Sequence, residues 1–190
     1  MMLDVLAAFW PVAALAVVLG IAVVTDLRNG KIYNQLTYPA MALGLIGHAF
    51  FGGLWGHELD PLGLVGALAG LAVGLLPLMA VSLAGGLGGG DAKLMGAIGA
   101  IGGWAFALSA MLYAFAAAVV LGLAILVHRR AVRQTFTRLG AAMVYVLAGR
   151  KPEMGERPES PTVPFGLALA VGSAAAGVEW WLTSPLAPRA

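Results

Sequence analysis

Residues 85–94 read GGLGGGDAKL: five glycines, one carboxylate and one lysine, set between two long apolar runs. The chain of 190 residues is 61% hydrophobic and only 11% charged, whereas soluble domains usually carry about 25% charged residues. A water-soluble domain of this size cannot bury so much apolar surface, so we expect a membrane protein. Asp91 then stands at the edge of a bilayer, where a charge is costly and needs a reason.

Long apolar runs predict six membrane-spanning helices, since about 20 apolar residues cross a hydrocarbon core about 30 Å thick. The uncharged stretch 94–127 is too long for one crossing, and Gly102-Gly103 offers a break, so it is divided into two spans. The predicted fold class is all-α: a polytopic membrane helical bundle with about six transmembrane helices, in one membrane-embedded domain over residues 1–190. The predicted spans are residues 5–24, 36–54, 62–83, 92–105, 107–127 and 164–183.

The basic residues predict the orientation of these spans. Six spans place ten of the eleven Lys and Arg residues on one face, which is cytoplasmic by the positive-inside rule. Both termini, and the loop that holds Asp60, then lie on the opposite, periplasmic face. Residues 129–163 are predicted to form a cytoplasmic amphipathic segment and a loop, because apolar residues first recur every three or four positions and prolines and charges follow.

Two carboxylates fall on the predicted cytoplasmic face. Asp26 ends the first span and Asp91 begins the fourth. Two carboxylates close together in a low-dielectric site do not both ionise easily, so one holds a proton while the other acts as a base. Such a pair activates water against a peptide carbonyl. The alternative is that both are ordinary interfacial charges, with Asp91 as the N-cap of its helix.

The glycines before Asp91 fit the same hypothesis. Gly88, Gly89 and Gly90 have no side chains to block an approaching substrate and adopt backbone angles that are closed to other residues. The alternative is a flexible turn combined with close helix packing. Glycines at 66, 70 and 74 recur every four residues in the third span, which predicts a smooth face for close helix packing.

Other polar residues give weaker signals. Asn34 and Thr37 open the second span near Asp26, and either orient its carboxylate or cap their own helix. The chain has no cysteine, and its three histidines share no ligand spacing, so we expect neither a metal site nor a cofactor.

Three stretches resemble a known family, the aspartic prepilin peptidases or type IV leader peptidases of bacteria. GGGDAKLMGAIGAIGGW at 88–104 is similar to the GxGD motif of that family. TDLRNGKIYNQLTYPAMALGLI at 25–46 resembles the region of its first catalytic aspartate, and VPFGLALAVG at 163–172 resembles the motif that opens its last span. The matches occur in the order of the family, with Tyr33 and Leu167 where the family usually has proline.

The resemblance implies an enzyme that removes leader peptides from prepilin or pseudopilin substrates at the cytoplasmic face of the bacterial inner membrane. Membrane lipids are the other expected partner, and nucleic acid is not one. The linker after the first span is short and lacks the cysteine-bearing insertion of larger members, which resembles the short type that processes Flp pilins of tight-adherence pili. The residues implied are the catalytic pair Asp26 and Asp91, the motif residues Gly88, Gly90 and Lys93, and the supporting residues Pro164, Phe165 and Gly166.

Two other classes of protein stay open from the residues alone. Carboxylates in the membrane and helices interrupted by glycine also suit a proton- or ion-coupled transporter. A non-catalytic subunit of a pilus or secretion assembly is the third possibility.

Overall fold

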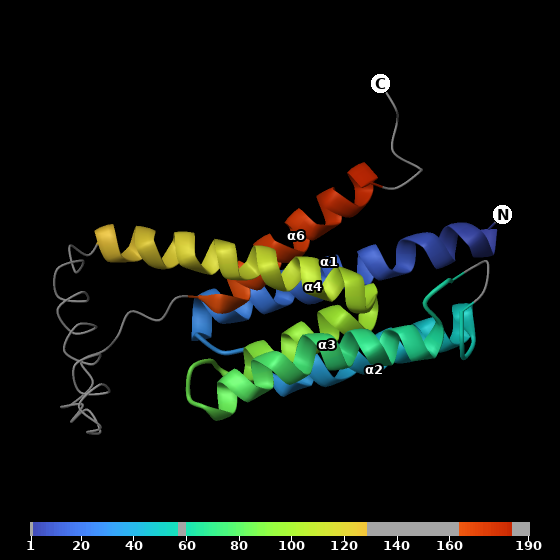
Figure 1. Cartoon of the computed structure of the whole chain (residues 1–190), viewed down its shortest axis with the longest axis horizontal. Helices are drawn as coiled ribbons and strands as arrows, with labels where there is room; N and C mark the ends of the chain where they lie inside the picture. The colour runs from blue at the N-terminus through green and yellow to red at the C-terminus, as the bar shows by residue number, and fades with distance from the viewer. Residues whose placement is uncertain (1, 57–59, 129–163, 184–190) are drawn as a thin grey trace. The chain divides into compact units, whose positions relative to one another are not determined.

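The computed structural model describes residues 2–56, 60–128 and 164–183, and all regular structure in them is helical. The helices are α1 (Met2–Asn29), α2 (Asn34–Gly52), α3 (Gly63–Leu83), α4 (Gly89–His128) and α6 (Phe165–Thr183) (Figure 1). The all-α class is therefore confirmed, whereas the predicted count of six helices is not supported by the five described. The chain divides into two units, of which the described residues are 2–56, 60–117 and 164–183 in the first and 118–128 in the second. The predicted amphipathic segment and loop at 129–163 lie outside the described residues.

Helix α4 is interrupted where the sequence predicted a break. Gly103 has φ 81° and ψ 173°, which is not helical, so two helical segments meet at this residue. A side chain added at Gly99 would lie 3.3 Å from the Cβ atom of Ala107, although eight residues of a continuous helix rise about 12 Å. The chain therefore turns back on itself at Gly103, and the predicted spans 92–105 and 107–127 lie within one interrupted element.

Four helices are long and apolar enough to cross a membrane by length and composition: Phe9–Asn29 of α1, then α3, α4 and α6. Helix α2, which matches the predicted span 36–54, is not among them, since it begins with Asn34 and Gln35 and contains His48. Helix α1 packs against α2 and α6, and α2 packs against α3 (Figure 1).

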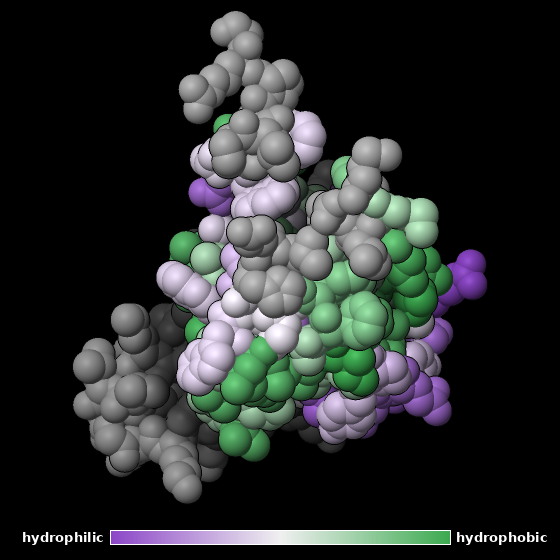
Figure 2. Space-filling model, turned by 90° about the vertical axis from the view of Figure 1, so that its right-hand side faces the viewer, coloured by the Kyte–Doolittle hydropathy of each residue, from purple (hydrophilic) through white to green (hydrophobic). Residues whose placement is uncertain are grey.

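The distribution of residue sizes is that of a membrane bundle. Many buried positions are occupied by alanine and glycine, whereas large apolar side chains such as Phe9, Ile46, Phe50 and Leu112 lie on the outside. Figure 2 shows apolar side chains together in the middle of the face that is turned to the viewer. Helices that associate in lipid gain nothing from removing apolar surface from water, so small residues that allow close backbone approach stabilise the bundle instead.

Glycines bring the other helices against the first part of α4. A Cβ atom at Gly44 of α2 would lie 2.7 Å from the carbonyl carbon of Ala100, and side chains at Gly70 and Gly74 of α3 would overlap the backbones of Gly99 and Met95. The predicted close-packing face of the third span is thus present at Gly70 and Gly74, while Gly66 faces the side chain of Leu62 in its own chain segment. As a result nearly every residue from Ala92 to Ile101 is buried.

Candidate functional site

Asp26 lies in the last turn of α1. The helix ends at Asn29, and Gly30 follows with φ 61° and donates its N–H to the carbonyl of Asp26 at 2.8 Å. This left-handed glycine closes the helix, as at many helix C-termini. The chain then crosses in four residues, 30–33, to the start of α2, so the carboxylate of Asp26 sits directly beside a short linker.

Asp91 is the third residue of α4. The carbonyl of Gly88 accepts hydrogen bonds from the N–H groups of Asp91 at 3.1 Å and Ala92 at 3.4 Å, which makes Gly88 the N-cap. The alternative that Asp91 is itself the N-cap is therefore wrong. Its carboxylate lies beside the backbone of Gly88, in the position of the third residue of a capping box. A side chain at Gly88 would press on this carboxylate, because a Cβ atom there would lie 2.8 Å from Asp91 Oδ2.

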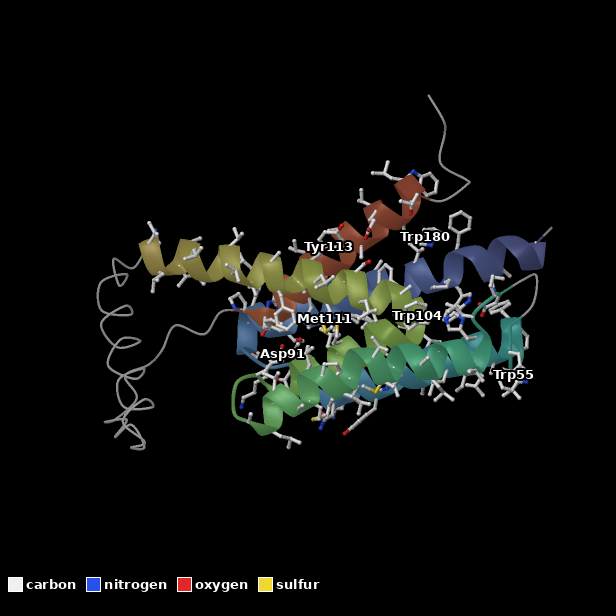
Figure 3. All side chains as sticks on the ribbon, in the orientation of Figure 1. Trp55, Asp91, Trp104, Met111, Tyr113 and Trp180 are labelled. Carbon is white, nitrogen blue, oxygen red and sulfur yellow. The ribbon has the colours of Figure 1, made fainter. Side chains whose placement is uncertain are left out.

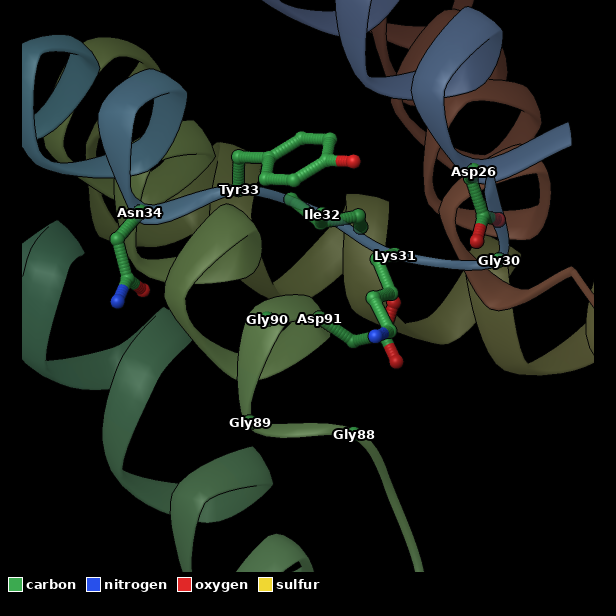
Figure 4. Close-up of a pocket in the computed structure, with 10 residues that line it drawn as sticks. All are labelled: Asp26, Gly30, Lys31, Ile32, Tyr33, Asn34, Gly88, Gly89, Gly90 and Asp91. Carbon is green, nitrogen blue, oxygen red and sulfur yellow. The ribbon is translucent and has the colours of Figure 1, made fainter. Parts of the chain in front are cut away.

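Asp26 and Asp91, 65 positions apart in sequence, line one cavity of about 380 Å³ (Figure 4). Figure 3 shows Asp91 at one end of the helices and Trp55 near the other, so the cavity lies where apolar segments end. The residues that line it come from the end of α1, the linker and the start of α4: Asp26, Gly30, Lys31, Ile32, Tyr33, Asn34, Gly88, Gly89, Gly90 and Asp91.

Asp26 is held from the far end of the sequence. The backbone N–H of Gly166, in the first turn of α6, donates to Asp26 Oδ2 at 2.9 Å. The first N–H groups of a helix lack partners within it, and the positive end of the helix dipole favours a carboxylate. A side chain at residue 166 would displace this carboxylate, because a Cβ atom there would lie 2.8 Å from the same Oδ2 atom. The predicted supporting residue Gly166 therefore contacts the site directly.

The neighbours of Gly166 shape the start of α6. The carbonyl of Pro164 accepts a hydrogen bond from the N–H of Ala168 at 3.3 Å. The ring of Phe165 packs at 5.9 Å from that of Phe115. Pro164 therefore accepts a hydrogen bond of the first turn of α6, and Phe165 packs this turn against α4.

Asn34, Thr37 and Lys93 have partners other than Asp26. Lys93 Nζ donates to Asn34 Oδ1 at 2.8 Å and lies 5.0 Å from the centre of the Tyr38 ring. Thr37 is buried, and its hydroxyl donates to the backbone carbonyl of Asn34 at 3.5 Å. The Lys93 bond joins the starts of α2 and α4, and the Thr37 bond lies within α2. The predicted role of Asn34 and Thr37 in orienting Asp26 is therefore not what the geometry displays.

The linker contributes residues that sequence reasoning did not assign to the site. Lys31 and Tyr33 line the cavity, and Lys31 brings a cationic side chain to it. Ile32 packs directly on Gly90: a Cβ atom at position 90 would lie 2.8 Å from the carbonyl oxygen of Ile32. Lys31, Ile32 and Tyr33 follow Asp26 within seven positions, and this closeness in sequence was the signal that could have placed them at the site.

The chemistry available is that of two carboxylates beside an open, glycine-lined cavity. One of them accepts a proton from water while the other donates one to a carbonyl oxygen, which is general acid–base catalysis. In the described part of the chain, no three His, Asp or Glu side chains gather as a metal site requires.

Comparison with known proteins identifies the family. The sequence model of the type IV leader peptidase family matches residues 13–126, which is more than half of the chain and includes both Asp26 and Asp91. The chain therefore belongs to this family, and membership supports a leader peptidase activity. No characterised protein and no solved structure matches the chain significantly.

Replacing Gly166 by alanine tests the contact with Asp26. The new methyl group would lie 2.8 Å from Asp26 Oδ2, so the carboxylate must move, and a displacement of about 1 Å costs up to about 10²-fold in rate. We expect Gly166→Ala to lose most leader-peptide cleavage of a co-expressed prepilin, scored by gel mobility. Gly177→Ala on the same helix is the control, since nothing lies within 4 Å of that position, and equal activity of the two variants would contradict the assignment.

Two adjacent glycines give a matched pair in the first turn of α4. Gly90→Ala must displace the linker at Ile32, whereas a Cβ atom at Gly89 meets only Ser82 Oγ, at 3.6 Å. We expect Gly90→Ala to reduce cleavage strongly and Gly89→Ala to cleave at close to the wild-type rate, with both proteins present in the membrane at equal amounts. Similar losses in both would mean that the loop needs glycine for flexibility alone.

Proposed function

We propose that this chain is a membrane aspartic endopeptidase that removes the leader peptide from type IV prepilin-like proteins, with Asp26 and Asp91 as its catalytic pair. The observation that carries the proposal is that these two carboxylates, from helices far apart in sequence, line one cavity of about 380 Å³. Family membership supports the reaction class, and the cavity supports the choice of residues.

The two carboxylates divide the work of peptide hydrolysis between them. The ionised one takes a proton from a water molecule, whose oxygen attacks the scissile carbonyl carbon. The protonated one donates its proton to the carbonyl oxygen, which gives a neutral tetrahedral intermediate. When this collapses, the C–N bond breaks, the leaving nitrogen receives a proton from the first carboxyl group, and the second recovers its own from the hydroxyl group.

The surroundings of the pair suit an extended peptide that leads into an apolar helix. Gly88 and Gly89 present backbone without side chains at the rim of the cavity, and the outer faces of the helices are apolar. The substrate helix is proposed to lie along these faces while its leader crosses the cavity. The four-residue linker 30–33 leaves no room for a further domain, which supports the short, Flp-pilin-processing type.

The site is proposed to face the cytoplasm across the bacterial inner membrane, with both termini periplasmic. Among the described residues the Lys and Arg side chains are Arg28, Lys31 and Lys93. Arg28 is in the last turn of α1, Lys31 in the linker and Lys93 in the first turns of α4, all at the cavity end. Basic residues gather on the cytoplasmic side of membrane proteins.

Asparagine substitutions test the catalytic pair. Asp26→Asn and Asp91→Asn keep size and most hydrogen bonding but cannot exchange a proton. Each is expected to reduce prepilin cleavage by about 10²–10⁴-fold without lowering membrane abundance, and the double variant should be little worse than either, as for residues that act as a unit. Cleavage is scored by mobility shift on co-expression.

The control for this experiment is Glu179→Gln, an exposed acid on α6 outside the cavity, which should cleave normally. Asp60, which the sequence places in a periplasmic loop, is unsuitable as a control because it is buried against His48. Near wild-type cleavage by either Asp26→Asn or Asp91→Asn would contradict the two-aspartate mechanism and favour a transporter or an assembly subunit.

Single cysteines test the orientation, because the chain has none of its own. Trp55, between α2 and α3, is 77% exposed, and Leu83, the last residue of α3, is 84% exposed. A membrane-impermeant maleimide should label Trp55→Cys in cells with a permeable outer membrane, and Leu83→Cys only after the inner membrane is lysed. The reverse labelling pattern would place the cavity on the periplasmic face.

A further inference from the structure

A buried polar pair lies outside the cavity. His48 of α2 and Asp60, just before α3, are 2% and 6% exposed, and their Nδ1 and Oδ2 atoms are 2.5 Å apart. His48 Nε2 lies 2.8 Å from the carbonyl oxygen of Ile101 in α4. Asp60 Oδ1 accepts the N–H of Leu62 at 3.0 Å. All four polar side-chain atoms of the pair therefore have partners in the described chain.

The partners assign the protons of the pair. A carbonyl oxygen only accepts, so His48 Nε2 carries a hydrogen and donates it to Ile101. One further proton lies between Nδ1 and Oδ2, on either atom, so the pair as a whole is neutral. A neutral, fully bonded pair is the form in which such groups tolerate burial.

The carbonyl of Ile101 needs this partner because of the break in α4. In an uninterrupted helix it would accept the N–H of residue 105, four positions on. The non-helical Gly103 removes that bond, which leaves a buried carbonyl unpaired unless a side chain supplies a donor. His48 therefore caps the first segment of α4 from outside the helix.

The pair also joins several elements. The indole of Trp10, from α1, packs edge-on against His48 with ring centres 4.9 Å apart. Gly47 makes room for it, since a Cβ atom there would lie 2.5 Å from the indole. Helices α1, α2 and α4 and the start of α3 thus meet at one polar centre.

We propose that His48 and Asp60 are positioning residues for the site: they fix the axial position of the first segment of α4 and so set where Asp91 stands relative to Asp26. This inference rests on the proposed function. Ile101 is ten positions from Asp91, about 15 Å along the helix, and the segment between them is almost wholly buried. A rigid, enclosed helix transmits a shift at one end to the other.

Kinetics and a distance measurement together test the proposal. His48→Phe keeps a ring but loses both hydrogen bonds. Asp60→Asn can keep both, since its amide donates to Nδ1 and its oxygen accepts from Leu62. We expect His48→Phe to lower kcat for prepilin cleavage about tenfold or more with KM little changed, and Asp60→Asn to stay close to wild type. If His48→Phe is not recovered folded, Asp60→Ala takes its place in the same measurements, since it removes the partner of His48 Nδ1 and retains the His48 ring.

Spin labels supply a readout that needs no activity. Cysteines at Asn29 and Gly89, both exposed beside the two aspartates, are the sole labelling sites in a cysteine-free chain. The label-to-label distance distribution should shift or broaden in His48→Phe and be unchanged in Asp60→Asn. An unchanged distance, or an unchanged kcat, in folded His48→Phe protein overturns the inference. If the wild-type protein cleaves no prepilin, and the label-to-label distance still changes in His48→Phe, the proposed function is refuted instead.

Discussion

Close backbone contact around the first segment of α4 is the constraint on which the other features depend. Glycines at 44, 70 and 74 let the backbones of α2 and α3 touch that segment. In lipid, dispersion contacts and interhelical polar contacts replace the hydrophobic effect as the force between helices, and both fall off steeply with distance. Because α4 is enclosed in this way, the position of Asp91 follows from packing along the whole segment rather than from the flexible glycine loop that precedes it.

Asp26 is placed by the opposite means. It stands at the end of α1, half-exposed, where packing constrains it little, and the N–H of Gly166 fixes one of its oxygens. The start of a helix therefore lies at each aspartate: α6 donates to Asp26, and Asp91 belongs to the first turn of α4. Helix N-termini favour negative charge, which offsets part of the cost of bringing two carboxylates to one cavity at the edge of an apolar bundle.

Features that depend on local sequence were predictable. Apolar runs located the helices, Gly102-Gly103 located the break, and the four-residue glycine repeat indicated the packing face that holds Gly70 and Gly74. Contacts between residues far apart in the sequence were not predictable. The pairs His48–Asp60 and Lys93–Asn34 produce no periodic pattern in a single sequence. The motif resemblance pointed to Gly166 but not to its bond with Asp26, 140 positions away. The predicted count of six is not supported, because the two predicted spans on either side of Gly103 belong to one interrupted element, α4, and α2 is less apolar than its neighbours.

The buried hydrogen bond between His48 and Ile101, at the end of the first α4 segment, fixes the register of that segment, which apolar packing alone does not do. A face of small residues that repeats every four positions, as in α3, packs almost equally well after a slip of one turn, about 5.4 Å. Such a slip would carry Asp91 out of the cavity. Hydrogen bonds cannot slip in this way, because a buried donor or acceptor left without its partner costs about 1–3 kcal/mol. The buried contact of His48 with the carbonyl of Ile101 therefore selects one register among several that the glycines permit, in the manner of a buried polar residue that fixes the register of a coiled coil.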